Sequence, residues 1–172
     1  MMNGRDVVLG ILNGSDRTGY EINEILKTRL SYFYDGTYGM IYPTLRKLES
    51  EGKIEKHIVI QTDKPNKNVF SITSEGKREF QKYLNSEVSQ EVFKSDFLLH
   101  LFFGESLRDD QIKNLIKNEI EYKQDKLNSL KKDNEEWEAN GISKTQKITV
   151  AYGIAQYEAV IRVLKESLAN YE

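Results

Sequence analysis

Apolar residues in the first part of the chain recur at helical spacing and are separated by short turn signals. Residues 5–12 predict a short helix that ends at Asn13-Gly14, a typical C-terminal cap. Thr18 and Glu21 have the spacing of a capping box and therefore predict the start of a second helix. The apolar face of this second helix consists of Ile22, Ile25, Leu26 and Leu30.

A third helix is expected before Gly52, because glycine commonly follows a helix end. Thr37 is a good N-cap for this helix, but Pro43 would then lie inside it, where proline removes a hydrogen bond. If the helix begins nearer Met40, Pro43 falls in the first turn and costs little. The sequence leaves both starting points open.

After Gly52 the pattern changes from helical spacing to alternation. Residues 54–61 and 69–73 predict two short strands, and the polar residues 62–67 between them predict a turn. Thr73 is predicted to cap a further helix that ends at about residue 85. Three helices, a two-stranded hairpin and a fourth helix are the layout of a winged helix-turn-helix.

The second half of the chain contains few helix breakers and predicts three helices. The first, Val88–Phe103, is apolar nearly all round and is expected to be buried on several sides. The other two, Arg108–Glu138 and Lys144–Ala169, are joined by a short turn and should pack antiparallel. The predicted fold is mainly α, with a winged helix-turn-helix and its β-hairpin in residues 1–85 and a helical domain in residues 86–172.

Charge separates the same two halves. The 172 residues include 25 Lys and Arg against 27 Asp and Glu, a net charge of −2. Residues 1–85 hold 13 basic and 11 acidic residues, a net of 13 − 11 = +2, and residues 86–172 hold 12 and 16, a net of 12 − 16 = −4. This asymmetry indicates two parts with different partners.

Composition argues against most catalytic sites. Cysteine is absent, and His57 and His100 are far apart in the sequence, so we expect no metal site and no catalytic thiolate. The sequence shows no Ser/His/Asp set, paired carboxylates or phosphate-binding loop, and predicts neither an enzyme nor a cofactor. No apolar run approaches the about 18 residues of a membrane span, and no signal-peptide pattern follows Met1. We therefore expect a cytoplasmic protein that does not associate with membranes.

The third helix is the candidate DNA-reading element. Its spacing predicts a buried stripe of Ile41, Leu45 and Leu48, which leaves Tyr42, Arg46 and Lys47 on or beside the outward face. Two cations and a tyrosine hydroxyl suit a groove floor and phosphates. Lys64 and Lys67 in the hairpin turn suit the sugar–phosphate backbone.

Three segments resemble the PadR family of transcriptional regulators. Residues 39–54, GMIYPTLRKLESEGKI, carry a Tyr-Pro pair, a Leu three residues after the Tyr, a Leu-Glu pair and a Gly before the wing. Residues 18–22, TGYEI, are similar to the second-helix motif, and residues 70–76, FSITSEG, to the second wing strand. Phe70 stands where tyrosine is usual, and Lys53 where an apolar residue is common. The helical second half resembles, by length and helix pattern, a longer branch of the family that includes virulence-gene activators.

The resemblance implies a homodimer whose two winged domains bind a palindromic operator in double-stranded DNA. The usual outcome in this family is repression, which a small and often aromatic effector relieves. Tyr38 has two interpretations, because it lies near Ile41 and could belong to the core. Motif match and position together assign DNA contact to Thr37, Tyr38, Tyr42, Arg46, Lys47, Lys64 and Lys67.

The last predicted helix carries an apolar seam without interruption. Such a seam packs either on the preceding helix of the same chain or on a second copy. We favour dimerisation, because a helical hairpin of this size has little core of its own and a two-fold dimer would bury the surplus. The seam consists of Val150, Ile154, Tyr157, Ile161, Leu164 and Leu168.

Aromatic residues before residue 104 are candidates for a small-molecule pocket. Phe93, Phe97 and His100 would line it, although simple core packing is an alternative for each of them.

A different class of function also fits the charge pattern. The winged fold would then dock proteins, and the tail would serve as a coiled-coil connector without DNA binding.

Overall fold

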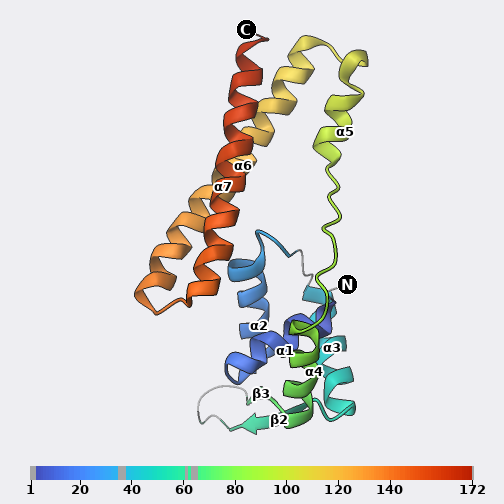
Figure 1. Ribbon diagram of the computed structural model, residues 1–172, viewed down its shortest axis with the longest axis vertical. Helices are drawn as coiled ribbons and strands as arrows, with labels where there is room; N and C mark the ends of the chain where they lie inside the picture. Colours follow the sequence, from blue (N-terminus) through green and yellow to red (C-terminus); the bar gives the residue numbers. More distant parts are fainter. Residues whose placement is uncertain (1–2, 35–37, 61, 63–65, 172) are drawn as a thin grey trace. The chain divides into compact units, whose positions relative to one another are not determined.

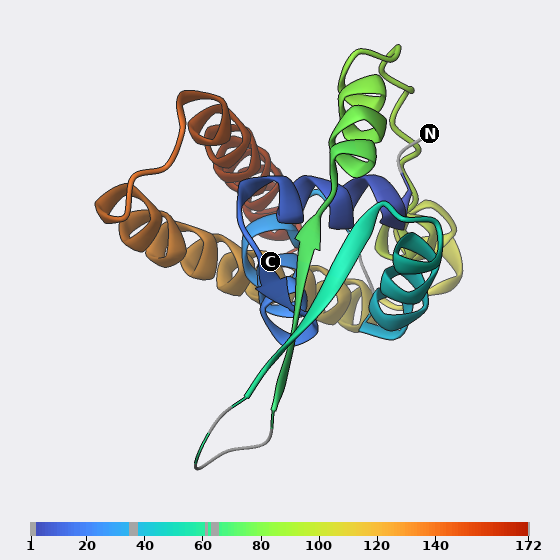
Figure 2. The same ribbon diagram turned by 90° about the horizontal axis from the view of Figure 1, so that it is seen from below.

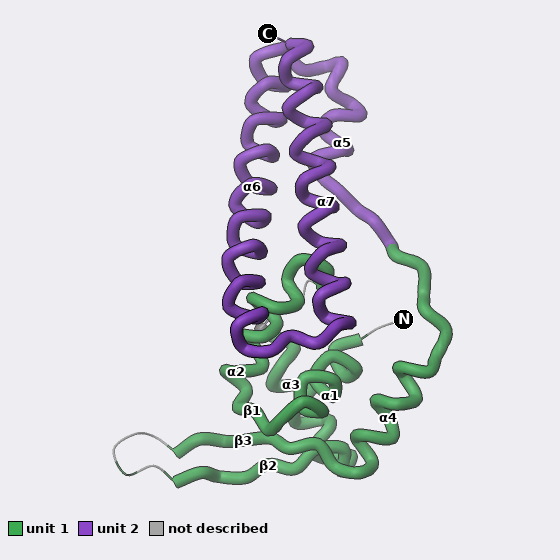
Figure 3. Tube along the Cα trace, turned by 60° about the vertical axis from the view of Figure 1, so that its left-hand side comes forward, with its two compact units in different colours: residues 1–91 green, residues 92–172 purple. Residues whose placement is uncertain are grey.

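The computed structural model describes residues 3–34, 38–60, 62 and 66–171. The chain folds into two compact units, residues 1–91 and residues 92–172 (Figures 1 and 3). Each unit has its own apolar core.

The first unit is a winged helix-turn-helix, as predicted. Its helices are α1 (Gly4–Gly14), α2 (Gly19–Ile25), α3 (Tyr38–Ser50) and α4 (Ser74–Leu84), and a π-helical turn, Leu26–Leu30, extends α2. The capping box of Thr18 and Glu21 is present, with the Thr18 hydroxyl oxygen accepting from the Glu21 amide at 3.2 Å. Gly52 follows α3 with φ at +65°, a left-handed conformation that favours glycine.

The sheet has three strands, one more than the sequence predicts. Strands β2 (Ile54–Val59) and β3 (Lys67–Ile72) form the expected antiparallel hairpin, which extends away from the helices (Figure 2). The additional strand, β1 (Arg17–Thr18), pairs antiparallel with β3, giving the order β1-β3-β2. A strand of two residues has no alternating pattern to detect, so the sequence could not reveal it.

The core of the winged unit lies between α1, α2, α3 and the base of the hairpin. The three residues predicted as the buried stripe of α3 are all at most 1 % exposed. They join one cluster with residues from α1, α2 and the sheet: Val8, Leu9, Leu12, Ile22, Leu26, Ile41, Leu45, Leu48, Ile54 and Phe70. The position of α3 is therefore fixed along its inner face.

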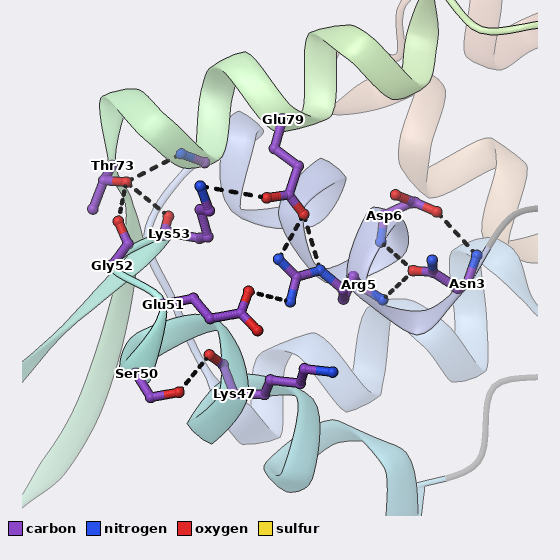
Figure 4. Close-up of polar contacts among 11 residues, drawn as sticks. Asn3, Arg5, Asp6, Lys47, Ser50, Glu51, Gly52, Lys53, Thr73 and Glu79 are labelled. Carbon is purple, nitrogen blue, oxygen red and sulfur yellow. Dashed lines mark hydrogen bonds and ion pairs between the residues drawn. The ribbon is translucent and has the colours of Figure 1, made fainter.

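A polar network at the edge of this core joins α1, the end of α3 and α4 (Figure 4). The guanidinium of Arg5 lies 2.6 Å from a carboxylate oxygen of Glu51 and 2.7 Å from one of Glu79. Glu79 is also 3.7 Å from the ammonium of Lys53. Burial disfavours the charge of Arg5, but hydrogen bonds to Glu79 and Glu51 outweigh it and raise the pKa of the guanidinium.

The second unit is helical, but its first helix is shorter than predicted. It contains α5 (Asp96–Phe102), a 3₁₀ turn at Gly104–Ser106, α6 (Asp109–Ala139) and α7 (Lys144–Ala169). The predicted helix over Val88–Phe103 is wrong before residue 96, where Ser95 caps the start of α5 through a hydrogen bond from the Leu98 amide. None of the residues of α5 is buried, contrary to the expectation of burial on several sides.

Helices α6 and α7 pack antiparallel, as the short turn between them predicts (Figure 3). Ile112, Ile116 and Leu164 form a buried cluster between them, and the half-buried Phe97 and Leu101 of α5 pack against it. Within the described part of the chain, no helix combines the length and apolar composition needed to cross a membrane.

Gly76 is predicted to be essential for the packing of α4. A Cβ atom at this position would lie 2.2 Å from the carbonyl oxygen of Lys53 and 2.8 Å from Ile72 Cγ1. We expect Gly76→Ala to lower the free energy of unfolding by about 3 kcal/mol, because backbone atoms must move. Gly14→Ala, where a Cβ meets nothing within 4 Å, is the control. Equal stability of both variants in urea denaturation would contradict the prediction.

Candidate nucleic-acid interface

Helix α3 has one buried face and one open face. Tyr42, Pro43, Arg46 and Lys47 are all exposed, opposite or beside the buried stripe. The ring of Tyr42 is half-covered, with 41 % of the residue exposed. The open face therefore offers one phenol and two cations on a helix whose inner face holds it in place.

Pro43 lies inside α3 and not in its first turn, since the helix is already formed at Tyr38. The alternative start near Met40 is wrong. Proline has no amide hydrogen, so the carbonyl of Gly39 does not receive the usual helix hydrogen bond from residue 43. Both residues are exposed, which allows that carbonyl to be satisfied from outside the chain.

The glutamates that follow the cations of α3 are engaged elsewhere. Glu49 lies 3.5 Å from the ammonium of Lys56 on β2, and Glu51 is bound to Arg5. Among the residues that the structure describes, neither Arg46 nor Lys47 has an ion-pair partner. The acidic residues next to them in sequence therefore do not neutralise the open face of α3.

Two lysines of the hairpin are predicted to contact DNA, and one of them, Lys67, lies among the described residues. Lys67 is exposed at the start of β3, opposite Val59 of β2 in the strand register. Lys64 and Thr37 lie outside the described residues. Tyr38 begins α3, but its side chain is also outside what the structure describes, so its assignment to core or DNA contact stays a prediction.

Glu21 is held at the start of α2 by the residue that caps this helix. Hydrogen bonds from the amide and hydroxyl of Thr18, at 2.7 and 2.8 Å, hold its carboxylate and lower its pKa. The positive charges of Arg17 and Lys67 lower that pKa further. Glu21 is thus kept ionised and bound to its own helix cap.

Gly19 is a contributor to the interface that the sequence reasoning did not single out. It is the first residue of α2 and is buried. A Cβ atom on it would lie 3.0 Å from Cε1 of Tyr42 and 3.1 Å from both Cζ and the phenolic oxygen. One edge of the exposed tyrosine therefore rests on the bare backbone of α2. The TGYEI segment contained the only sequence signal, a glycine where a helix begins.

The predicted effector residues have different environments. Phe97 is half-buried and packs into the core of the helical unit. Phe93 is 68 % exposed in the segment before α5. His100 is exposed as well, with Nε2 at 3.5 Å from a carboxylate oxygen of Asp96.

The predicted dimerisation seam of α7 is largely covered within the chain. Val150, Ile161 and Leu164 are buried, and the remaining members, Ile154, Tyr157 and Leu168, are half-buried. Lys123 of α6 lies over the ring of Tyr157, 5.9 Å from its centroid, and burial raises the pKa of this phenol. The seam thus packs on α6, and its role between subunits stays a prediction.

Comparison with known proteins covers both units. Residues 8–82 match the model of the Transcriptional regulator PadR-like family, and residues 93–172 match that of the Virulence activator alpha C-term. The Negative transcriptional regulator PadR of Bacillus subtilis is 32% identical over 124 residues, which are 72% of this chain and 68% of that protein. The chain belongs to the PadR-like family of transcriptional regulators. Members of this family are regulators and not enzymes.

Two solved structures extend the likeness to the whole chain. The crystal structure of smu.1604c from Streptococcus mutans has 56% identity and a TM-score of 0.91, covering 98% of this chain and 99% of that one. Bacillus subtilis PadR in complex with operator DNA has 25% identity and a TM-score of 0.83, covering 98% of both chains. The match to PadR-like regulators therefore includes the helical unit.

Proposed function

We propose that this PadR-like regulator is a homodimeric repressor that binds a palindromic operator and is released by a small effector. The observation that carries the DNA-binding part is the open face of α3, where Arg46 and Lys47 stand without ion-pair partners among the described residues beside the exposed Tyr42. The name of the Bacillus subtilis relative, a negative transcriptional regulator, supports repression over activation.

The open face of α3 suits the major groove of B-form DNA. The groove is wide enough for a helix, and arginine commonly donates two hydrogen bonds to the edge of a guanine. Arg46 is placed for such reading, while Lys47 at its side would contact phosphate. Pro43 and Gly39 are compact, so they allow the helix backbone to approach the DNA closely.

The hairpin would position the winged unit by contacts with the sugar–phosphate backbone. Lys67 is exposed on β3, and the sequence places Lys64 in the turn before it. Long cationic side chains reach phosphates readily, and such contacts strengthen binding to any DNA sequence. Thr37 and Tyr38, which precede or begin α3, would add contacts at the end of the same helix.

A second copy of the chain is the proposed cover for the outer face of α5. Leu98, Leu99, Phe102 and Phe103 are between 46 % and 79 % exposed. They lie opposite Phe97 and Leu101, the residues of this helix that pack towards α6. Three large apolar side chains on so short a helix, with Phe103 directly after it, form a patch of the kind that marks an interface, and a two-fold axis would bury it twice.

Helix α7 offers a second apolar stripe to the same partner. Ile148, Tyr152 and Val163 are more than half exposed and lie on the side of the helix opposite the seam that packs on α6. The exposed alanines at positions 155 and 159 continue this stripe and permit close approach of another helix. The seam residues of α7 would then support the dimer from inside by holding α6 and α7 together.

The effector part of the proposal rests on aromatic surface near α5. Phe93 is exposed before this helix, and the exposed His100 lies on it three residues after Phe97. Aromatic rings and an imidazole suit a small aromatic molecule through stacking and one hydrogen bond. A bound effector that changes how the α5 surfaces meet would alter the spacing of the two DNA-reading helices.

Arg46→Ala is expected to weaken binding to a duplex selected from a random-sequence pool, without loss of fold. The side chain is exposed, so its removal opens no cavity, and each lost base contact costs about 1–3 kcal/mol per half-site. Fluorescence anisotropy titrations on the selected and scrambled duplexes measure this. Arg78→Ala on α4, another exposed cation of the same unit, is the control. Overlaying isotherms for wild type and Arg46→Ala would remove this residue from the interface.

Lys67→Ala should affect selected and scrambled duplexes by similar factors. Each phosphate contact releases counterions, so the slope of log K against log salt should become shallower by about 0.9 per contact, or about 1.8 per dimer. Lys132→Ala, an exposed lysine of α6, should leave the slope unchanged. If the Lys67 variant keeps the wild-type slope, the hairpin does not touch phosphate. Absence of duplex binding by the wild type would favour a protein-docking adaptor.

Phe102→Asp should convert the dimer to a monomer with its helical content retained. The side chain is 79 % exposed and its ring contact within the chain is with the exposed Phe103, so the charge opens no cavity in the core and acts on the open surface. Light scattering gives the mass, and circular dichroism the helical content. Asn118→Asp adds the same charge at an exposed position of α6 and should leave the dimer intact. A wild type that is monomeric at micromolar concentration, or a Phe102→Asp variant that stays dimeric, would contradict the assignment.

A further inference from the structure

The backbone conformation at position 19 does not require a glycine. Among the described residues, positive φ angles occur at Gly52 and Gly141, and Gly19 is not one of them. It occupies the first position of α2, after the Thr18 cap, where alanine would favour the helix more. The atoms that surround the α-carbon of Gly19 therefore have to explain why a side chain is absent there.

The space above the Gly19 α-carbon is filled by the side chain of Tyr42. The three nearest atoms to an added Cβ are all at the outer end of this phenol, at 3.0 to 3.1 Å. Such distances are closer than ordinary contacts, so an alanine here would displace the ring by a few tenths of an ångström. A tyrosine ring is rigid and turns about only two torsions, so pressure at its outer end reorients the whole group.

Tyr42 is at the same time one of the exposed side chains of the open face of α3, with 41 % of its surface in solvent. The outer end of the ring thus lies against α2, while part of the residue remains in solvent. Other tightly placed glycines of this unit have different neighbours. Gly4 would meet the flexible end of Met40, and Gly10 would meet Phe80 of α4.

We propose that Gly19 is a positioning residue for DNA recognition, whose missing side chain sets the orientation in which Tyr42 presents its hydroxyl group. This inference rests on the proposed role of the open face of α3 in DNA binding. The start of α2 thereby influences which DNA sequence α3 binds. It does so through the steric contact between Gly19 and Tyr42, and Gly19 itself does not contact DNA. A larger residue at position 19 would give the same third helix a differently aimed tyrosine.

The test is a series at position 19 in two backgrounds, with the full-length protein. Gly19→Ala and Gly19→Val are made in the wild type and in Tyr42→Ala, with Gly14→Ala as a control glycine whose Cβ meets nothing within 4 Å. Affinity is measured on the duplex selected from a random-sequence pool and on its scrambled counterpart. Ring signals of ¹³C-labelled tyrosine, assigned with Tyr42→Phe, report the position of the phenol without DNA.

In the wild-type background, Gly19→Ala should move the Tyr42 signal and weaken binding to the selected duplex about threefold to tenfold, as expected for a misaligned contact. Gly19→Val should weaken it further, and the scrambled duplex should respond little. In the Tyr42→Ala background, neither substitution should change affinity, since no ring remains to be displaced.

Two results would overturn the proposal. Equal losses of affinity in both backgrounds would show that Gly19 acts through α2 itself, and an unmoved Tyr42 signal in Gly19→Ala would show that the ring does not depend on it. Failure of the proposed function has a different signature. The wild type would then show no preference for the selected duplex, whereas the Tyr42 signal would still move in Gly19→Ala.

Discussion

The arrangement of the winged unit depends on the burial of three side chains from α3. Ile41, Leu45 and Leu48 enter a core formed by α1, α2 and the base of the hairpin, and each of them is almost completely removed from solvent. Full burial of one such side chain contributes about 1.5–3 kcal/mol. Because these residues recur every three or four positions, their burial fixes the rotation of α3 about its own axis. The identity of the outward residues follows directly, and so does the exposure of Arg46.

Electrostatics then decides whether that outward face is cationic. In sequence, Glu49 and Glu51 follow Arg46 and Lys47 closely enough to neutralise them. The fold separates the two charges by giving each glutamate another partner, Lys56 of β2 and Arg5 of α1. These pairs lie at the surface or its edge and contribute little to stability. Their main consequence is the local charge, since they leave the cations of α3 available to an anionic partner.

Much of the winged unit could be predicted because each signal in it is local. Thr18 and Glu21 form their capping box within one turn, Gly52 ends α3, and the motif around Tyr42 names the family. The sequence-based predictions were wrong or incomplete where the local sequence pattern does not encode the structural feature. Strand β1 is too short to alternate, and the helix predicted to start at Val88 starts only after the cap at Ser95. The contact of Gly19 with Tyr42 joins two helices, so no spacing within either helix contains it.

The helical unit shows a related limit, because periodicity identifies an apolar face without identifying what covers it. The seam of α7 had two possible partners, and α6 of the same chain occupies it. That internal packing uses only one side of α7 and leaves the outer side chains of α5 open. A unit that satisfied its apolar surface within one chain would not retain Phe102 and Phe103 in solvent. The apolar surface that stays open therefore lies on α5 and on the face of α7 opposite the seam, which is where the proposed dimer would bury it.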